Sequence, residues 1–308
     1  MNNVLVVTQE GIGDCVYQLP FVKILAKTNQ VYIKTPLPKI FKDVPNIKFI
    51  KLDNETYRTQ QKSLLNDDTV YSTLPKDIYK TYTPQYAGEE LLETSIVGSF
   101  YKQFNIPFHE KLEWELPSFK NELGNFLSKI PKGRKIAIIR PATVRKEWRV
   151  ETRSPKNGYI SWGAKILKES GYYTISIADI KSGEEWFDGD YDSKNIDLNL
   201  HTGELGIYGT LGLIQIADVC IGGSGFIVPA TVSTNCNLFL ILGGRLMYDG
   251  ISKTLHPSMN LSKIGIAIPD NPCKCTLNKH NCDKTISNLD IKFFEFLEKI
   301  SKKDNPTF

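Results

Sequence analysis

The sequence lacks several features that would place it in a specialised class of protein. None of its 308 residues belongs to an uninterrupted apolar run of about 18 residues, the length that a transmembrane helix needs. The first apolar run meets Gly11 and Asp14 too early for a secretory signal peptide. Six cysteines do not suggest a disulfide scaffold in a chain of this size. We therefore expect a soluble, cytoplasmic protein with no transmembrane segment.

Two common catalytic signatures are also missing. No stretch reads G-x-x-x-x-G-K-[ST], which argues against a P-loop nucleotide hydrolase. Only four histidines are present, and none stands in a Ser-His-Asp or Cys-His arrangement typical of nucleophilic catalysis. The remaining composition, 41% hydrophobic and 23% charged, is that of a globular protein, so collagen-like, coiled-coil and wholly disordered classes are excluded.

What the sequence does contain is an alternation of strand-like and helix-like segments, as in α/β proteins with parallel sheets. The predicted strands are residues 4–8, 31–34, 47–52, 69–72, 135–140, 172–178, 219–221, 237–242 and 264–268, and the predicted helices are residues 15–27, 89–104, 159–170, 205–217, 226–233 and 291–300. Residues 106–134, which are rich in proline, look like a passage between domains. We predict two Rossmann-like domains, residues 1–130 and 131–287. Residues 288–308 then form a C-terminal helix, for which packing back on the first domain is one option.

Positive charge is concentrated in one segment. Residues 131–160 carry nine Lys and Arg against Glu147 and Glu151, a net charge of +7, whereas the whole chain has +4 and residues 1–130 have zero. Such a concentration indicates an anionic ligand, either a phosphate or a nucleic-acid backbone. A solvated basic loop on the surface is the alternative.

A glycine turn follows the first predicted strand. Gly11 and Gly13 permit a tight turn into the next helix, but Val16 stands where the dinucleotide fingerprint requires a third glycine. Asp14 begins this helix and is either a simple N-cap or a functional carboxylate. At the carboxyl end of a strand in an open α/β sheet it would face the ligand, where it could act as a general base.

Two further segments favour phosphate binding in the second half of the chain. Thr143, Arg145 and Lys146 follow the predicted strand at 135–140, so they are placed to hydrogen-bond and neutralise a diphosphate. Residues 222–225, with Ser224 and Gly225, form a second glycine turn before a helix, whose free N–H groups could hold a phosphate. A tight strand-to-helix turn without a ligand is the alternative.

Four soft metal ligands lie within ten residues near the C-terminus. Cys273, Cys275, His280 and Cys282 form a set compatible with a structural zinc, although their spacing is tighter than in common zinc motifs. Free thiols or a local disulfide are the alternatives. Cys15, Cys220 and Cys236 lie in apolar contexts that indicate the core.

Four segments, taken together and in order, are similar to one enzyme family. They are VLVVTQEGIGDCVYQLP at 4–20, RPATVRKEW at 140–148, TGEL at 202–205 and ADVCIGGSGFIVPATVSTNCNLFLILGG at 217–244. The first resembles the family's opening of strand, Gly-Asp, helix and Leu-Pro. The second resembles its donor loop, and the last its long glycine signature. The chain thus resembles the heptosyltransferase-like glycosyltransferases of family 9.

This resemblance implies a GT-B fold, in which two Rossmann-like domains with parallel sheets face a central cleft. The first domain would bind the acceptor and the second a nucleotide-sugar donor, and the sugar would be transferred with inversion and without a catalytic metal or other cofactor. By position, Asp14 corresponds to the family's general base, Thr143 and Lys146 to donor-phosphate contacts, and Glu204 to the acidic residue that holds the nucleoside. Gly13, Arg145, Ser224 and Gly225 complete the expected donor site.

Two departures from the family pattern bear on the donor and on the function. Gly223 stands where the family has Asp, and Val228 where it often has His, so an ADP-heptose donor is in question. These departures favour an alternative function, a catalytically silent GT-B-like protein that binds a nucleotide or a glycan. A nucleotide-sugar epimerase would need more carboxylates or histidines than we can place. A lipopolysaccharide-type glycan is the acceptor that the family implies. A hydroxylated base in DNA is a second option, which the zero net charge of residues 1–130 disfavours.

Overall fold

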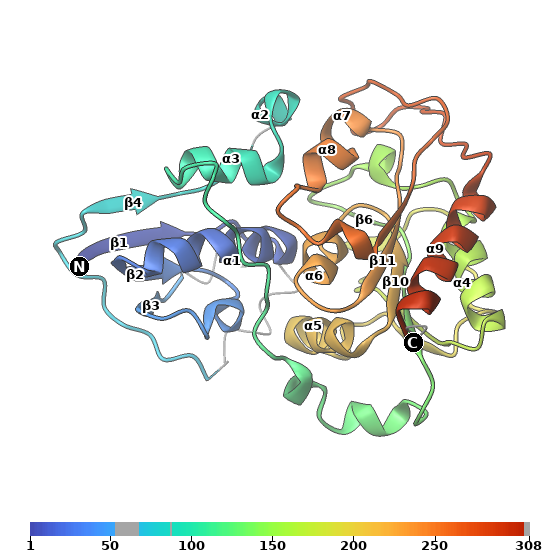
Figure 1. The fold of residues 1–308 in the computed structure, drawn as a ribbon, viewed down its shortest axis with the longest axis horizontal. Coiled ribbons are helices and arrows are strands. Elements are labelled where there is room, and N and C mark those ends of the chain that lie inside the picture. Colours follow the sequence, from blue (N-terminus) through green and yellow to red (C-terminus); the bar gives the residue numbers. More distant parts are fainter. Residues whose placement is uncertain (53–67, 87, 305–308) are drawn as a thin grey trace. The chain divides into compact units, whose positions relative to one another are not determined.

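The computed structural model describes residues 1–52, 68–86 and 88–304, and the chain divides into two compact units, residues 1–118 and residues 119–308 (Figure 1). The boundary falls inside the proline-rich passage at 106–134. Across the described residues, no helix has both the length and the apolar character needed to cross a membrane.

The first unit is built on a four-stranded parallel sheet with strand order β3-β2-β1-β4. Its strands are β1 (Asn2–Val7), β2 (Asn29–Lys34), β3 (Ile47–Ile50) and β4 (Lys80–Tyr82), and its helices are α1 (Ile12–Ala26), the short η1 (Pro38–Phe41), α2 (Gly88–Glu93) and α3 (Ile96–Gln103). Val4, Leu5 and Val6 of β1 are buried because this strand has a neighbour on each side and is covered on both faces.

Helix α1 and helix α3 share an aromatic core in this unit. The ring of Phe21 in α1 stacks on that of Phe104 with centroids 5.4 Å apart, and it meets Tyr101 edge-on at 5.1 Å. All three side chains are buried. These contacts hold the second half of α1 against the end of α3, because aromatic rings bury large apolar areas and prefer offset or edge-to-face packing.

Two predicted elements of the first unit are wrong. Residues 69–72 do not form a strand; Tyr71 makes a single bridge, to Phe49 of β3. A strand that was not predicted, β4 at residues 80–82, pairs with β1. The helix predicted at 89–104 is divided into α2 and α3. The division lies at Ser95, whose hydroxyl accepts a hydrogen bond from the N–H of Gly98 and so begins a new helix.

The second unit is a doubly wound domain with a six-stranded parallel sheet of order β12-β11-β10-β5-β7-β9. The strands of this sheet are β5 (Ile136–Arg140), β7 (Tyr173–Ile177), β9 (Leu198–Leu200), β10 (Val219–Gly222), β11 (Asn237–Ile241) and β12 (Ile264–Ala267); β6 (Thr143–Arg145) and β8 (Glu185–Phe187) form a separate antiparallel pair. The helices are α4 (Tyr159–Glu169), α5 (Gly206–Ile216), α6 (Ile227–Val232), α7 (Leu246–Asp249), α8 (Ile251–Thr254) and α9 (Leu289–Asp304), with short 3₁₀ segments η4 (Lys120–Lys129), η5 (Glu151–Arg153) and η6 (Leu261–Lys263).

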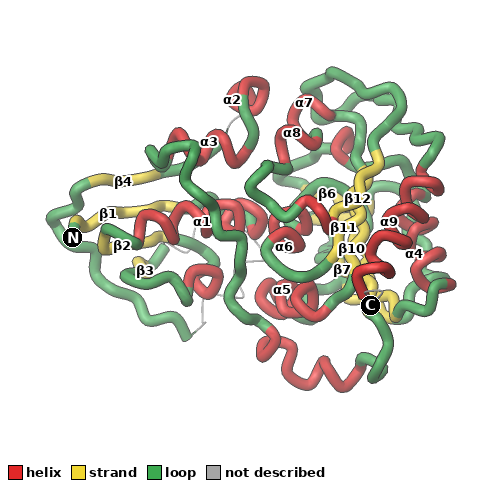
Figure 2. The backbone as a smooth tube through the Cα atoms, viewed as in Figure 1, coloured by secondary structure: helices red, strands yellow, loops and turns green. Residues whose placement is uncertain are grey.

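Helices cover both faces of this sheet. Figures 1 and 2 show α4 and α9 on one side of the strands and α5 and α6 on the other. On the α4 and α9 face, Phe293 and Phe296 of α9 pack against Phe239 of β11, with ring centroids 4.6 and 5.3 Å apart. The apolar face of the last helix is therefore buried against strands β11 and β12 of the second unit.

The order of strands fixes where a ligand site can form. In both sheets the first strand of the unit lies in the middle, and the chain turns back beside it: β4 beside β1 in the first unit, and β10 beside β5 in the second. Ligands of open α/β sheets bind outside the carboxyl ends of the strands at such a reversal point. Functional side chains are therefore expected just after β1, β4, β5 and β10.

Candidate active site

Asp14 lies in the first turn of α1, directly after β1, and its carboxylate folds back over Gly11. Gly11, not Asp14, occupies the N-cap position, and its backbone is extended with φ −71° and ψ 146°. A Cβ atom on Gly11 would be 2.2 Å from Oδ2 of Asp14, so only glycine leaves room for the carboxylate there. The N-cap interpretation of Asp14 is therefore wrong. Gly13 lies in the same helical turn.

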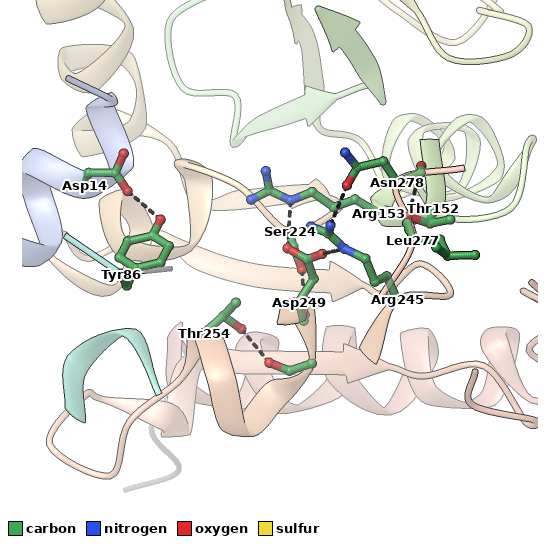
Figure 3. Close-up of polar contacts among 11 residues, drawn as sticks. Asp14, Tyr86, Thr152, Arg153, Ser224, Arg245, Asp249, Thr254, Leu277 and Asn278 are labelled. Carbon is green, nitrogen blue, oxygen red and sulfur yellow. Dashed lines mark hydrogen bonds and ion pairs between the residues drawn. The ribbon is translucent and has the colours of Figure 1, made fainter. Parts of the chain in front are cut away.

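Tyr86 holds the other oxygen of this carboxylate. Its phenol donates a hydrogen bond of 2.6 Å to Oδ1 of Asp14, as Figure 3 shows. Tyr86 follows β4, the strand next to β1, so two segments that are 72 residues apart meet at the reversal point of the sheet. Sequence reasoning missed Tyr86 because it placed no strand at 80–82. The Asp14 carboxylate is thus held by Tyr86 at the edge of the sheet where open α/β proteins bind ligands.

Thr143 and Arg145, which were expected to contact the donor phosphates, share a buried carboxylate in the second unit. The Thr143 hydroxyl donates to Oε1 of Glu185 at 2.8 Å, and Nε of Arg145 pairs with Oε2 at 2.7 Å. Arg140 donates a hydrogen bond of 3.0 Å to the Thr143 hydroxyl. Burial lowers the pKa of Arg140, and the negative charge of Glu185 partly opposes this shift. Thr143 and Arg145 are thus largely engaged within the protein.

Lys146 is different from these two residues. It is exposed on the loop after β6, and within the described residues it has no ion pair. Its backbone N–H is bonded to the carbonyl of Glu184, which fixes the position of the loop. Lys146 is therefore a cation that remains available to a ligand.

Glu204 caps the turn that precedes α5. Its carboxylate accepts hydrogen bonds from the backbone N–H groups of His201 (3.3 Å) and Thr202 (2.9 Å). Burial acts to raise the pKa of Glu204, but these donors outweigh it and leave the pKa below its ordinary value. His201 lies beside it, bonded to the Ser176 hydroxyl at 2.8 Å, and burial lowers the pKa of this histidine.

The glycine turn at 222–225 follows β10 and lies next to the end of β5. Gly222 pairs with Arg140, and a Cβ on Gly222 would be 3.0 Å from the Arg140 carbonyl oxygen, so glycine allows the two strand ends to approach. A Cβ on Gly223 would be 3.0 Å from Pro155, which leaves little room for a side chain at this position. Gly225, in contrast, is open. The Ser224 hydroxyl donates to the carbonyl of Asp249 at 3.1 Å.

Behind this turn lies a network that the sequence did not reveal (Figure 3). Arg245 is buried, pairs with Oδ2 of Asp249 at 2.8 Å and donates to the side-chain oxygen of Asn278 at 2.9 Å. Arg153 pairs with the second oxygen of Asp249 at 3.3 Å. In the sequence, Arg153 is only one of the nine basic residues of segment 131–160. The sequence feature that could have pointed to Arg245 is its position directly after Gly244, at the end of a predicted strand.

The four soft ligands near the C-terminus converge in space. The ligand atoms of Cys273, Cys275, His280 and Cys282 all lie within 4.8 Å of one another. Nδ1 of His280 is 3.5 Å from Sγ of Cys273 and 3.3 Å from Sγ of Cys282, and the sulfur atoms of Cys275 and Cys282 are 3.4 Å apart. A tetrahedral zinc with bonds of about 2.0–2.3 Å requires ligand atoms at about this separation, so the set fits the metal.

Comparison with known proteins gives no close relative in sequence. No family model matches the chain, and no curated protein is significantly similar to it. Solved structures are similar in fold. Heptosyltransferase II of Escherichia coli, an ADP-heptose lipopolysaccharide heptosyltransferase, is similar over 99% of this chain and 100% of its own, with 12% identity and a TM-score of 0.62.

A second similar structure is TibC of enterotoxigenic E. coli, described as an iron-containing dodecameric glycosyltransferase. It is similar over 99% of this chain and 77% of its own, with 11% identity and a TM-score of 0.61. TibC has also been solved in complex with ADP-D-β-D-heptose, and this structure gives a TM-score of 0.60 with 12% identity over the same shares. The chain is thus similar in fold to these solved GT-B glycosyltransferases. The predicted α/β class with parallel sheets is confirmed.

Proposed function

We propose that the protein is a glycosyltransferase that moves a sugar from a nucleotide-diphosphate donor to an acceptor hydroxyl. The observation that carries this proposal is the carboxylate of Asp14, held by Tyr86 at the carboxyl end of β1 in a GT-B-like fold. A similar structure, TibC, was solved with a nucleotide sugar bound, which supports a donor of this chemical class.

In the proposed reaction Asp14 is the general base. It takes the proton of the acceptor hydroxyl as that oxygen forms a bond to the anomeric carbon, and the bond from this carbon to the diphosphate breaks on the opposite face. The configuration at the anomeric carbon is therefore inverted. The electron pair and negative charge of the broken bond leave with the nucleoside diphosphate. Fixed cations and N–H donors stabilise this charge, so the reaction needs no catalytic metal.

The donor is assigned to the residues of the second unit. Lys146 is the exposed cation for the diphosphate, Glu204 is proposed to hold the nucleoside, and Ser224 and Gly225 form the open part of the glycine turn. Thr143 and Arg145 are proposed to act mainly by shaping the loop, because Glu185 engages both of them. Gly13 is proposed to contribute to donor binding through a turn that carries no side chain.

The acceptor proposed here is a glycan. Heptosyltransferase II carries lipopolysaccharide in its name, which supports a lipopolysaccharide-type acceptor. None of the similar structures named above is described as acting on DNA.

A catalytically silent binding protein is the second candidate. Gly223 and Val228 favour it, because Pro155 leaves little room for the Asp that the family has at 223, and Val228 is a buried apolar residue. A protein of this kind would bind the donor without transferring or hydrolysing it, so catalysis and binding must be measured separately.

We further propose that Cys273, Cys275, His280 and Cys282 bind a structural zinc. Three sulfur atoms and one imidazole nitrogen match a closed tetrahedral zinc site, which leaves no position open for catalysis. TibC is described as iron-containing, so iron is the competing metal to be tested.

The proposed function is tested in two stages. Thermal-shift screening against UDP-, ADP-, GDP- and CMP-sugars identifies the donor, because a ligand that binds the native state raises the melting temperature. Initial rates of transfer and donor hydrolysis are then measured for the wild type and for Asp14→Asn. We expect the variant to bind the donor as the wild type does and to turn over about 10²-fold more slowly or worse. Full turnover by Asp14→Asn would remove Asp14 from the mechanism, and donor binding with no turnover in the wild type would support the silent binding protein.

A further inference from the structure

The cations of the basic segment at 131–160 are unequal in their availability. Several of its arginines already have acceptors inside the protein: Arg134 donates to the carbonyls of Gly171 and Tyr172, Arg140 and Arg145 pair with Glu185, and Arg149 pairs with Glu151. A net charge of +7 read from the sequence therefore overstates what a ligand meets. Among the described residues of this segment, one guanidinium keeps donors that no acceptor in the protein uses.

Arg153 is that guanidinium. It forms an ion pair with Oδ1 of Asp249 through Nε at 3.3 Å, but no hydrogen-bond acceptor for it is found in the described part of the chain, and its Nε is buried. The side chain is 23% exposed, so the outer nitrogens can be reached from solvent. A guanidinium has five N–H donors in a planar fork, and buried donors normally find partners. Arg153 thus has hydrogen-bonding capacity that the protein itself does not use.

The position of Arg153 is fixed from three directions. Its guanidinium lies over the ring of Trp148, 4.7 Å from the centroid. The carbonyl oxygen of Arg153 packs on Gly243, where a Cβ would be 2.3 Å away. The preceding residue, Thr152, is tied by its hydroxyl to the carbonyl of Leu277 at 2.7 Å and by its N–H to that of Asn278 at 3.2 Å (Figure 3). Such restraint reduces the entropy that a long side chain loses when it binds a ligand.

The guanidinium of Arg153 lies at the open end of the glycine turn. The nearest atom to a Cβ built on Gly225 is Nη2 of Arg153, at 3.9 Å. The carboxylate of Asp249 is shared by Arg153 and Arg245, so these three groups together carry a net charge of +1. A planar donor fork with net positive charge, next to a backbone without side chains, matches the oxygens of a phosphate.

We infer that Arg153 binds the diphosphate of the donor at the glycine turn, the role that the sequence predicted for Arg145. Asp249 and Arg245 hold the Arg153 side chain in position. This inference rests on the proposed function. It names the residue that supplies the cation at Ser224 and Gly225. Arg245 has its own acceptors in Asp249 and Asn278, so it acts on the ligand through Asp249 and Arg153 rather than by contact.

The test measures binding of inorganic pyrophosphate and ADP to the full chain by calorimetry. The variants are Arg153→Gln, Arg153→Lys and a matched control, Arg149→Gln. Arg149 is an exposed arginine, paired with Glu151 and four residues before Arg153, so the control removes the same charge from the same segment. We expect Arg153→Gln to weaken pyrophosphate and ADP about tenfold to a hundredfold, the range for loss of a charged hydrogen bond. Arg153→Lys should recover part of the affinity, because it restores the charge but not the fork, and Arg149→Gln should bind as the wild type does. The melting temperature of each variant shows that it is folded.

The outcomes separate this inference from the proposed function. Wild-type affinity in Arg153→Gln, with nucleotide sugars still bound and transferred by the wild type, overturns the role of Arg153 and leaves the proposed function standing. An equal loss in Arg149→Gln also overturns it, because the effect is then one of general charge. Failure of the wild type to bind pyrophosphate, ADP or any nucleotide sugar overturns both. A loss confined to the Arg153 variants, in folded protein, supports the assignment.

Discussion

Replacement of Gly11 by alanine tests whether the placement of Asp14 matters, because it moves the carboxylate without changing its chemistry. The backbone of Gly11, with φ −71° and ψ 146°, is one that alanine adopts without strain. The new Cβ, however, would lie 2.2 Å from Oδ2 and 3.1 Å from Cγ of Asp14. The carboxylate must therefore move by about 1 Å to reach ordinary van der Waals distance, and it then leaves the 2.6 Å hydrogen bond from Tyr86.

The structure gives different magnitudes for stability and for catalysis. Loss of the Tyr86 hydrogen bond costs roughly 1–2 kcal/mol. The smaller conformational entropy of alanine in the unfolded chain offsets about 0.4–1 kcal/mol of this. The net loss in the free energy of unfolding is thus expected to be about 1 kcal/mol. A misplacement of about 1 Å in a catalytic group can lower turnover about 10²-fold. Gly11→Ala should therefore be a folded protein with a severe defect in kcat.

The assay is the initial rate of sugar transfer with the donor found in the nucleotide-sugar screen, together with thermal melting of each variant. Gly98→Ala is the matched control, because its Cβ would press on a side-chain oxygen in the same unit, Oγ1 of Thr94 at 2.1 Å, without contacting Asp14. We expect near wild-type kcat in the control and a loss close to that of Asp14→Asn in Gly11→Ala. Wild-type kcat in a folded Gly11→Ala would refute the argument that the carboxylate must sit over this glycine.

Two further predictions concern the second unit. Purified protein should contain about one metal ion per chain by elemental analysis, with zinc expected over iron. Cys282→Ser should lose the metal and melt several degrees lower, because metal binding to such sites contributes directly to folding. Cys236→Ala, the control, should retain the metal. Equal metal content in the wild type and in Cys282→Ser would contradict the site. His201, whose pKa burial lowers, should destabilise the fold as the pH falls below about 6.5, because the unfolded chain takes up the proton first. Denaturant unfolding at pH 7.5 and 5.5 should therefore show a smaller loss of stability for His201→Gln than for the wild type, and identical losses would rule out this contribution.

Several structural features could be predicted from local patterns. The alternation of buried strands and amphipathic helices gives the α/β class, because strand and helix periods are properties of neighbouring residues. The helix predicted at 159–170 ends as expected before Gly171, which has φ +88°. Cys273, Cys275, His280 and Cys282 were recognisable as a set of soft ligands from their spacing. An extended segment of this length spans about 30 Å, however, so the fold of the loop is what brings their ligand atoms within 4.8 Å of one another.

The errors in the first unit concern which segments join the sheet. Residues 69–72 have the composition of a strand but make only one bridge, from Tyr71 to Phe49 of β3, whereas residues 80–82, where no strand was predicted, pair with β1. This error hid Tyr86, which reaches Asp14 only because β4 lies next to β1.

The sequence alone determined the fold class, the two glycine turns and the carboxylate at the start of α1, because each depends on residues within one turn or one element of the chain. Only the tertiary structure decided which charges are free. Glu185 forms an ion pair with Arg145, 40 positions away in the sequence. Asp249 pairs with both Arg153 and Arg245, and Arg153 lies beside Gly225. Ion pairs form between side chains that the sheet order brings together, and Coulomb interactions depend on distance in space, not on position in the sequence.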